Sequence, residues 1–415
     1  MTTNPPFSER HQWWLVTVAT LCGFVAAYNI GKISAALPEI RSEFEASLSF
    51  AATLVSSYST VSMFSALLLG ILVSRYGSFR IGGCGLLLLL IGGLFGSYAQ
   101  SLPLLLATRV LEGMGYIAIA VAMPAFISSV CNVRVRPLAM GVWGAFVPGG
   151  IAISLLLSPA LLQSGGWRTL WQAGCFFAAI CLLLLIVFVR PAARQLQQSS
   201  ASGVGAGVGA DCSGSRLLSV FRRDPLVLAG CFAVYSANFS GLTLVLPTLW
   251  AESELAGAPF AARLAAVVVM MNILGNLTGG WLNSRGVPLR MVLSIALIGS
   301  GVFAGLVFLI EFSLLLQVIC AGLSVFIGGM LPATVFASVA LYSQRQKQAG
   351  LILGLVFQGA AVGQVFGPVF LGAVVDYFGQ WQMAVVYFAG TSLIAVVLVQ
   401  FLSEPSTDRS SIHAT

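Results

Sequence analysis

The chain has 415 residues, of which 58% are hydrophobic and only 8% are charged, and its formal net charge is +7. This composition excludes an ordinary soluble domain, in which about a quarter of the residues are charged. A bilayer core takes about 20 apolar residues per helix. We therefore expect an all-α membrane protein in contact with lipid. No nucleic-acid partner is needed to explain the positive charge, because cytoplasmic loops of membrane proteins are rich in Lys and Arg.

Taken in chain order, the sequence contains enough long apolar runs for twelve transmembrane helices. Six of them precede a Gly- and Ser-rich stretch and six follow it. The predicted helices are 13–36, 50–73, 81–100, 103–130, 138–162, 168–189, 225–250, 260–283, 291–311, 313–341, 349–375 and 381–402.

The two groups of six define the expected domains. An N-terminal half covers 1–190 and a C-terminal half covers 222–403, followed by a tail, 404–415. Between the halves, residues 191–221 contain the run Gly203-Val-Gly-Ala-Gly-Val-Gly-Ala, which is typical of a flexible linker. An even number of helices per half gives both halves the same orientation in the membrane.

The two halves repeat one pattern. Asn29 and Asn238 stand 209 positions apart, and each precedes a Leu-Pro pair by eight residues. Such duplicated units build transporter sites that face each side of the bilayer in turn, so we expect two pseudo-symmetric bundles. The other matched pairs are Gly70 and Gly280, Ser74 and Ser284, Arg75 and Arg285, Arg80 and Arg290, Pro124 and Pro332, and Trp167 and Trp381.

The basic residues predict the orientation. With a cytoplasmic N-terminus, all of the 20 basic residues fall on the cytoplasmic side except Lys32, Arg41, Arg109, Arg168 and Arg263. By the positive-inside rule, both termini are therefore cytoplasmic. We expect a multi-pass protein of the bacterial inner (plasma) membrane.

The loop after the second helix carries the first family motif. Gly70, Ser74, Arg75, Gly77 and Arg80 follow the spacing Gly-x-x-x-Asp-(Arg/Lys)-x-Gly-x-x-(Arg/Lys), which resembles the major facilitator superfamily. The resemblance implies that these residues act in gating, with a second copy that includes Ser284 and Arg285. Serine replaces the acid in both copies, so we do not expect the charge interactions that lock the family's cytoplasmic side.

Helices 4, 5 and 11 extend the resemblance. Arg109-Val-Leu-Glu-Gly113 is similar to the family's Arg-x-x-x-Gly motif, which is associated with proton coupling. Pro148 in helix 5 and the pair Gly367-Pro368 in helix 11 are candidate bending points for gating. The run 136–145 resembles the cyanate-transporter-like branch of the family.

Three ionisable residues within the spans are functional candidates, because charge in a membrane is expensive. Lys32 lies about 9 Å from Pro38 along its helix, and Arg109 and Glu112 lie about 9 and 13 Å from Pro103. The three are therefore at similar depth. Arg109 and Glu112 can neutralise each other at i,i+3, which leaves a net charge of +1 from Lys32. This excess favours a small anion as substrate, with Glu112 and Arg109 in proton coupling.

Alternative interpretations remain open for these residues. Lys32 can instead extend to the outer interface, and Arg109 with Glu112 can be a purely structural pair. The other candidate substrate-binding residues are polar or aromatic positions that can line the cavity or hold helices together. They are Tyr28, Asn29, Trp143, Asn238 and Gln358.

The sequence thus predicts a secondary active transporter that works by alternating access and couples the symport of a small organic or inorganic anion to protons. Proton-driven efflux of amphipathic compounds is the alternative, and a non-transporting membrane receptor is a third. An enzyme is not expected, because no span contains a histidine and no P-loop is present. We expect a monomer with no cofactor and no metal.

Overall fold

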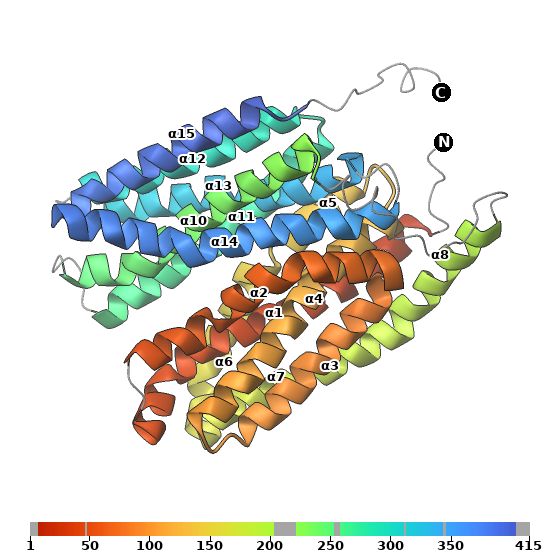
Figure 1. Cartoon of the computed structure of the whole chain (residues 1–415), viewed down its shortest axis with the longest axis horizontal. Coiled ribbons are helices and arrows are strands. Elements are labelled where there is room, and N and C mark those ends of the chain that lie inside the picture. Colours follow the sequence, from red (N-terminus) through yellow and green to blue (C-terminus); the bar gives the residue numbers. More distant parts are fainter. Residues whose placement is uncertain are drawn as a thin grey trace.

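The computed structural model describes residues 7–45, 48–202, 221–252, 258–310, 313–342 and 346–403. These residues form two helical bundles lying side by side (Figure 1). The first bundle contains α1 (Glu9–Phe44), α2 (Leu48–Tyr76), α3 (Ser78–Ser97), α4 (Leu102–Val130), α5 (Arg136–Gly144), α6 (Phe146–Gly165) and α7 (Trp167–Leu184). The second contains α10 (Arg223–Glu252), α11 (Ala258–Ser284), α12 (Leu289–Leu309), α13 (Leu314–Tyr342), α14 (Gln346–Phe378) and α15 (Ala384–Gln400).

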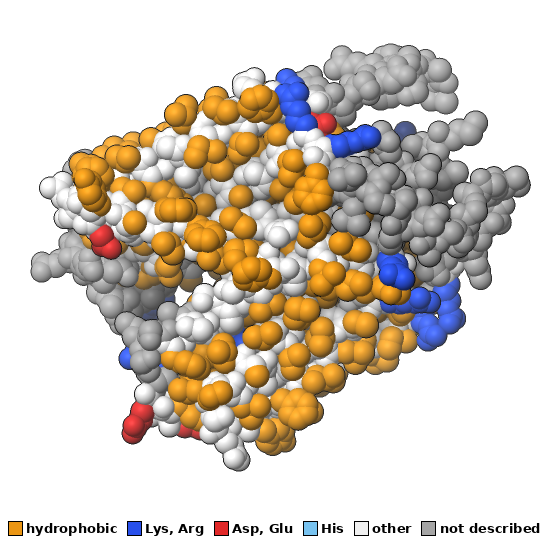
Figure 2. Space-filling model, in the orientation of Figure 1, with side chains coloured by type: hydrophobic (Ala, Val, Ile, Leu, Met, Phe, Trp, Pro, Cys, Tyr) orange, Lys and Arg blue, Asp and Glu red, His pale blue; other side chains and the backbone are white. Residues whose placement is uncertain are grey.

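Within these described ranges, twelve helical stretches are long and apolar enough to cross a membrane, which confirms the predicted number and the all-α fold class. Hydrophobic side chains cover both bundles on the face seen in Figure 2, and basic side chains gather toward one end. That end is where α1 begins and α15 ends (Figure 1), and we call it the terminal end. The apolar belt between the two ends is the surface that lipid requires.

The fifth span is interrupted. It consists of α5 and α6, which are separated at Ala145. Proline has no N–H to bond the carbonyl four residues earlier, and its ring clashes with that carbonyl. For Pro148 that residue is Gly144, the last residue of α5. Pro148, which we expected to bend this helix, therefore lies just after the interruption. By contrast, α14 is not interrupted at Pro368.

The sixth span is longer than predicted. After α7, a π-helical turn (Leu185–Val189) leads directly into α8 (Arg190–Ser202). Ala192 is buried and Leu196 packs against the core of the first bundle. The first part of the expected linker, up to Ser202, is therefore helical, because one face of it finds apolar partners. Residues 203–220 lie outside the described residues.

The two bundles meet along two closely packed helix pairs. Near the terminal end, a Cβ on Gly70 of α2 would lie 2.6 Å from the Gly350 carbonyl oxygen of α14. Likewise, a Cβ on Gly141 of α5 would lie 3.0 Å from Gly280 Cα of α11. Only residues without a side chain let the backbones approach this closely. Figure 2 shows a hollow between the bundles at the opposite end.

These two contacts are related by the internal repeat. Gly70 and Gly280 are the matched glycines of the two motif copies, and Gly141 and Gly350 are also separated by the repeat distance, 209 positions. The same glycine pair thus occurs twice, with the motif glycine supplied by the first bundle in one contact and by the second bundle in the other. We call these two contacts the glycine seams.

Candidate functional site

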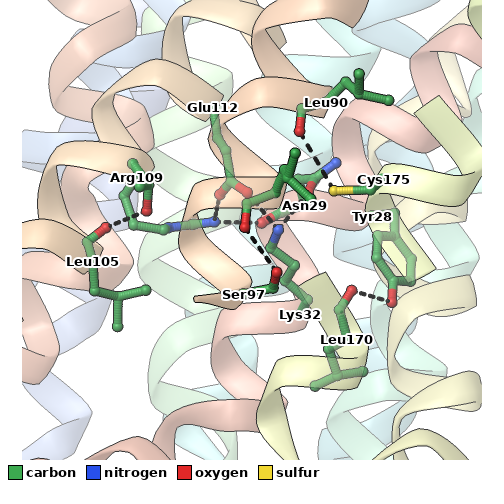
Figure 3. Close-up of polar contacts among 12 residues, drawn as sticks. Tyr28, Asn29, Lys32, Leu90, Ser97, Leu105, Arg109, Glu112, Leu170 and Cys175 are labelled. Atoms are coloured by element: carbon green, nitrogen blue, oxygen red, sulfur yellow. Dashed lines mark hydrogen bonds and ion pairs between the residues drawn. The ribbon is translucent and has the colours of Figure 1, made fainter. Parts of the chain in front are cut away.

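The predicted charged residues meet inside the first bundle. Lys32 of α1 donates from Nζ to Glu112 Oε1 at 2.6 Å, and Arg109 donates from Nη1 to Glu112 Oε2 at 2.7 Å. One carboxylate of α4 therefore bridges two cations, as Figure 3 shows. We call Lys32, Arg109 and Glu112 the ion cluster.

Asn29 completes the connection between α1 and α4. Its Oδ1 accepts a hydrogen bond from Lys32 Nζ at 2.6 Å, and its backbone oxygen accepts one from Arg109 Nη1 at 2.9 Å. Its own amide donates to the Val25 carbonyl at 2.8 Å. Because Asn29 stands one helical turn before Lys32, one face of α1 supplies both the cation and an acceptor for each cation of the cluster.

An aromatic ring flanks each cation. Lys32 Nζ lies 4.4 Å from the centre of the Trp171 ring of α7, and Arg109 Cζ lies 4.2 Å from that of Tyr58 of α2. These are cation–π distances, and such contacts are strongest where water is excluded. The two rings, one from α7 and one from α2, therefore border the cluster without adding charge.

Glycines on α3 make room for the cluster. A Cβ on Gly92 would lie 2.9 Å from Glu112 Cγ, and one on Gly96 would lie 2.5 Å from Trp171 Cδ1. A Cβ on Gly93 would lie 2.7 Å from Cys175 Sγ of α7. Three side-chain-free positions on one helix thus let Glu112 and Trp171 pack against its backbone.

The cluster is fully buried, and with all three groups ionised it carries a net positive charge. The side chains of Lys32 and Glu112 are 0% exposed, and so is that of Arg109. Two cations and one carboxylate leave an excess of one positive charge. A buried charge without a partner is strongly destabilising, so such a cluster favours a further anion or the loss of a proton. Arg109 Nε and Nη2 have no hydrogen-bond partner within the described residues.

Burial settles one alternative for Lys32. A lysine that extends to the interface keeps its ammonium group in water. Lys32 instead lies within hydrogen-bond distance of two acceptors and has no exposed surface. The interpretation of Lys32 as an interfacial residue is therefore wrong.

Two other candidates in the first bundle lie apart from the cluster. The Tyr28 hydroxyl donates to the Leu170 carbonyl of α7 at 3.0 Å, and its ring lies against Phe177. Trp143 of α5 stacks on Phe146 at 4.4 Å between ring centres and is fully buried. The Tyr28 hydroxyl thus has a hydrogen-bond partner, whereas Trp143 Nε1 has none within the described residues.

The candidates of the second bundle differ from each other. Gln358 of α14 donates to the Met63 carbonyl of α2 at 3.1 Å, so it links the two bundles. Asn238 of α10 is 4% exposed, and neither amide atom has a hydrogen-bond partner in the part of the chain that the structure describes. The repeat thus places an asparagine at the same point in each bundle, but only Asn29 has charged partners.

The gating candidates of the first motif lie at the terminal end. Gly70 forms a glycine seam, and the Ser74 hydroxyl donates to the Gly70 carbonyl at 3.0 Å within α2. Gly77 precedes α3 with a φ of 89°, a conformation that favours glycine. Arg75 lies over the Tyr76 ring and Arg80 is exposed. Serine at the family's acidic position therefore bonds within its own helix.

The remaining gating candidates lie in or near the second bundle. The Ser284 hydroxyl donates to the Trp281 carbonyl at 2.7 Å, and Arg285 lies over the Trp281 ring. A Cβ on Gly367 would lie 2.5 Å from Ala237 Cα, so α14 packs directly on α10 at this residue. The serine of the second motif copy thus also bonds within its own helix, but to the carbonyl three residues earlier rather than four.

Sequence reasoning missed the neutral surroundings of the cluster. Tyr58, Trp171 and the α3 glycines were not among the candidates, although all contact or border the charged groups. Spacing along one helix cannot reveal them, because they come from three other helices. The only available signal was the Gly-Gly-x-x-Gly pattern at 92–96.

Comparison with known proteins is consistent with this architecture. A sequence profile of the Major Facilitator Superfamily matches residues 19–271 and 228–414. The chain is 24% identical to the cyanate transport protein CynX of Escherichia coli (strain K12), over 92% of this chain and 96% of that protein. It is 25% identical to the nitrite extrusion protein of Bacillus subtilis (strain 168), over 80% and 79% of the two chains.

Other similarities are partial or concern the fold alone. The arabinose-proton symporter of Escherichia coli (strain K12) is 26% identical over 46% of this chain, and the match spans only 40% of that symporter. Among solved structures, the proton:xylose symporter XylE superposes with a TM-score of 0.77 at 16% identity, covering 96% of this chain and 97% of that one.

Proposed function

Because the chain belongs to the Major Facilitator Superfamily, we propose that it is a secondary active carrier that couples the movement of a small organic or inorganic anion to protons. The observation that carries this proposal is the ion cluster, with two cations, one carboxylate and no exposed side-chain surface. Its cargo is a small molecule, its coupling ion is the proton, and it works as a monomer without a cofactor.

The excess charge selects the sign of the substrate. A net positive charge held away from water is costly, and an anion bound nearby offsets part of that cost because charges interact strongly at low dielectric. Arg109 keeps the hydrogens on Nε and Nη2 without acceptors in the described residues, so it has donors for an anion. Two relatives that match over most of their length, named for cyanate transport and nitrite extrusion, support a small anion as cargo.

Alternating access is supported by the unequal ends of the interface. The glycine seams bring the bundles together near the terminal end, and the hollow in Figure 2 lies at the opposite end. Rocking of the bundles would open the seams and close the hollow. By the positive-inside rule, the terminal end is cytoplasmic, so this conformation faces outward from the bacterial inner membrane.

The test is uptake into proteoliposomes under an imposed proton gradient. Labelled cyanate, monocarboxylates and aromatic acids are offered to the wild type, to Glu112→Gln and to Glu43→Gln. The same substitution at Glu43 removes a charge that pairs with Arg168 near the surface, so it is the matched control. We expect gradient-driven accumulation of one anion by the wild type and by Glu43→Gln, and exchange without accumulation by Glu112→Gln. Undiminished accumulation by Glu112→Gln refutes a role of Glu112 in coupling.

A further inference from the structure

The groups around Lys32 determine which residue of the cluster can change its charge. From α4 it faces Glu112 and, behind the carboxylate, Arg109. From α7 it faces the Trp171 ring, with the Cys175 thiol beside the cluster. From its own helix it faces the neutral amide of Asn29. The neighbouring surface of α3 carries no charge, because it consists of glycines.

Charge balance identifies the group that exchanges a proton. Arg109 stays protonated, because an arginine guanidinium does not lose its proton in proteins. Protonation of Glu112 would leave two buried cations with no anion between them, which raises the net charge to +2. Loss of a proton from Lys32 instead leaves Glu112 paired with Arg109 and a net charge of zero. Burial of charge therefore favours exchange at Lys32.

The contacts of Lys32 suit both of its forms. Within the described residues, its Nζ has two hydrogen-bond acceptors, Asn29 Oδ1 and Glu112 Oε1, both at 2.6 Å. A neutral amine has two N–H groups and satisfies both acceptors. The third N–H of the ammonium form has the Trp171 ring face at 4.4 Å. Neither form leaves an acceptor of this pair unbonded.

We propose that Lys32 carries the coupled proton, and that one proton binds to its Nζ with each monovalent anion that enters. This proposal rests on the proposed function, since it specifies how the same site is coupled. With an anion bound, the lone pair of Nζ takes a proton from a hydronium ion, so an N–H bond forms while an O–H bond breaks and leaves water. The charge of the cluster and that of the anion then cancel. When the anion leaves on the other side, that N–H bond breaks, its electron pair returns to Nζ and the proton goes to water.

The consequence is electroneutral transport. A monovalent anion and one proton move together and carry no net charge across the membrane. A pH gradient therefore drives accumulation, whereas a membrane potential imposed by a potassium gradient does not. Accumulation driven by a pH gradient therefore distinguishes a Lys32 that exchanges a proton from a Lys32 of fixed charge. A fixed cation would attract the anion without coupling its movement to protons.

Two substitutions at Lys32 test the proposal. Lys32→Arg fixes the positive charge, so we expect anion exchange to persist and pH-driven accumulation to be lost. Lys32→Met fixes the neutral state, and we expect the same loss; it decides the matter if the larger arginine prevents folding. Accumulation that persists in either folded variant would assign the proton to Glu112 and overturn the proposal.

A second readout needs no transported anion. Trp171 lies against Nζ, so its fluorescence should change when Lys32 loses its proton. The signal of Trp171 is the difference between the wild type and Trp171→Phe. We expect a transition in a pH titration of the purified protein that is absent from Lys32→Arg. If the wild type moves no anion, the proposed function fails, but the fluorescence titration still tests whether Lys32 exchanges a proton. A Trp171 signal that shows no transition with pH would refute proton exchange at Lys32.

Discussion

Adding one methyl group to a glycine seam should shift the equilibrium between the two faces of the carrier. In Gly70→Ala, the new Cβ would lie 2.6 Å from the Gly350 carbonyl oxygen and 3.1 Å from Gly354 Cα. Both neighbours are backbone atoms of α14, so no rotamer change relieves the contact. The helices must separate, and the seam is weakened.

The size of the shift follows from the cost of overpacking. Extra methyl groups in a well-packed interior cost about 1–3 kcal/mol. If that cost falls only on the conformation in which the seam is closed, the ratio of open to closed molecules rises about 5- to 150-fold.

Thiol labelling measures this ratio. Ser74 lies beside the seam, since its Oγ is 3.1 Å from the Cβ position of Gly350. A cysteine at Ser74, in a background where the exposed Cys84 is replaced, should be labelled faster in proportion to the open fraction. Gly372→Ala on α14, the helix that Gly70 packs against, is the control, because a Cβ there has no atom within 4 Å. Equal labelling rates in the two variants would refute the role of the seam.

Three further substitutions test the energetics of the site by unfolding in detergent. Glu112→Ala leaves two buried cations without their carboxylate, so stability should fall by about 3–5 kcal/mol; a loss below about 1 kcal/mol would contradict a dry cluster. Trp171→Leu removes the ring under Lys32 and should cost about 0.5–2 kcal/mol, measured against Trp14→Leu at an exposed position. Glu43→Gln should change stability by less than about 1 kcal/mol, because its pair with Arg168 is more than a third exposed and is screened by salt.

The helices were largely predictable because long apolar runs have few other stable forms. All twelve spans were placed, and the boundary between 291–311 and 313–341 agrees with α12 and α13 within a few residues. The extension of the sixth span to Ser202 was not predictable from the sequence. The apolar face of this segment is narrow, and its composition resembles that of a linker. The interruption of the fifth span at Ala145 follows from Pro148. It lies three residues before the proline, because the carbonyl that Pro148 cannot bond belongs to Gly144.

The charged residues of the site were predictable, and their partners were not. Depth along a helix is fixed by its rise per residue, so Lys32, Arg109 and Glu112 could be placed at one level. Rotation of one helix relative to another depends on packing, which a single sequence does not reveal. The prediction therefore paired Arg109 with Glu112 and left Lys32 alone, whereas Glu112 contacts both cations.

The central claim is that anion and proton cross together. The most direct test loads proteoliposomes with a pH-sensitive dye and imposes an inward gradient of the transported anion with no initial pH difference. For a monovalent anion, the interior should become acidic as the anion enters, by one proton per anion, and Lys32→Met should abolish this acidification. Entry of the anion without acidification, or with an electrical current of one charge per anion, would contradict it.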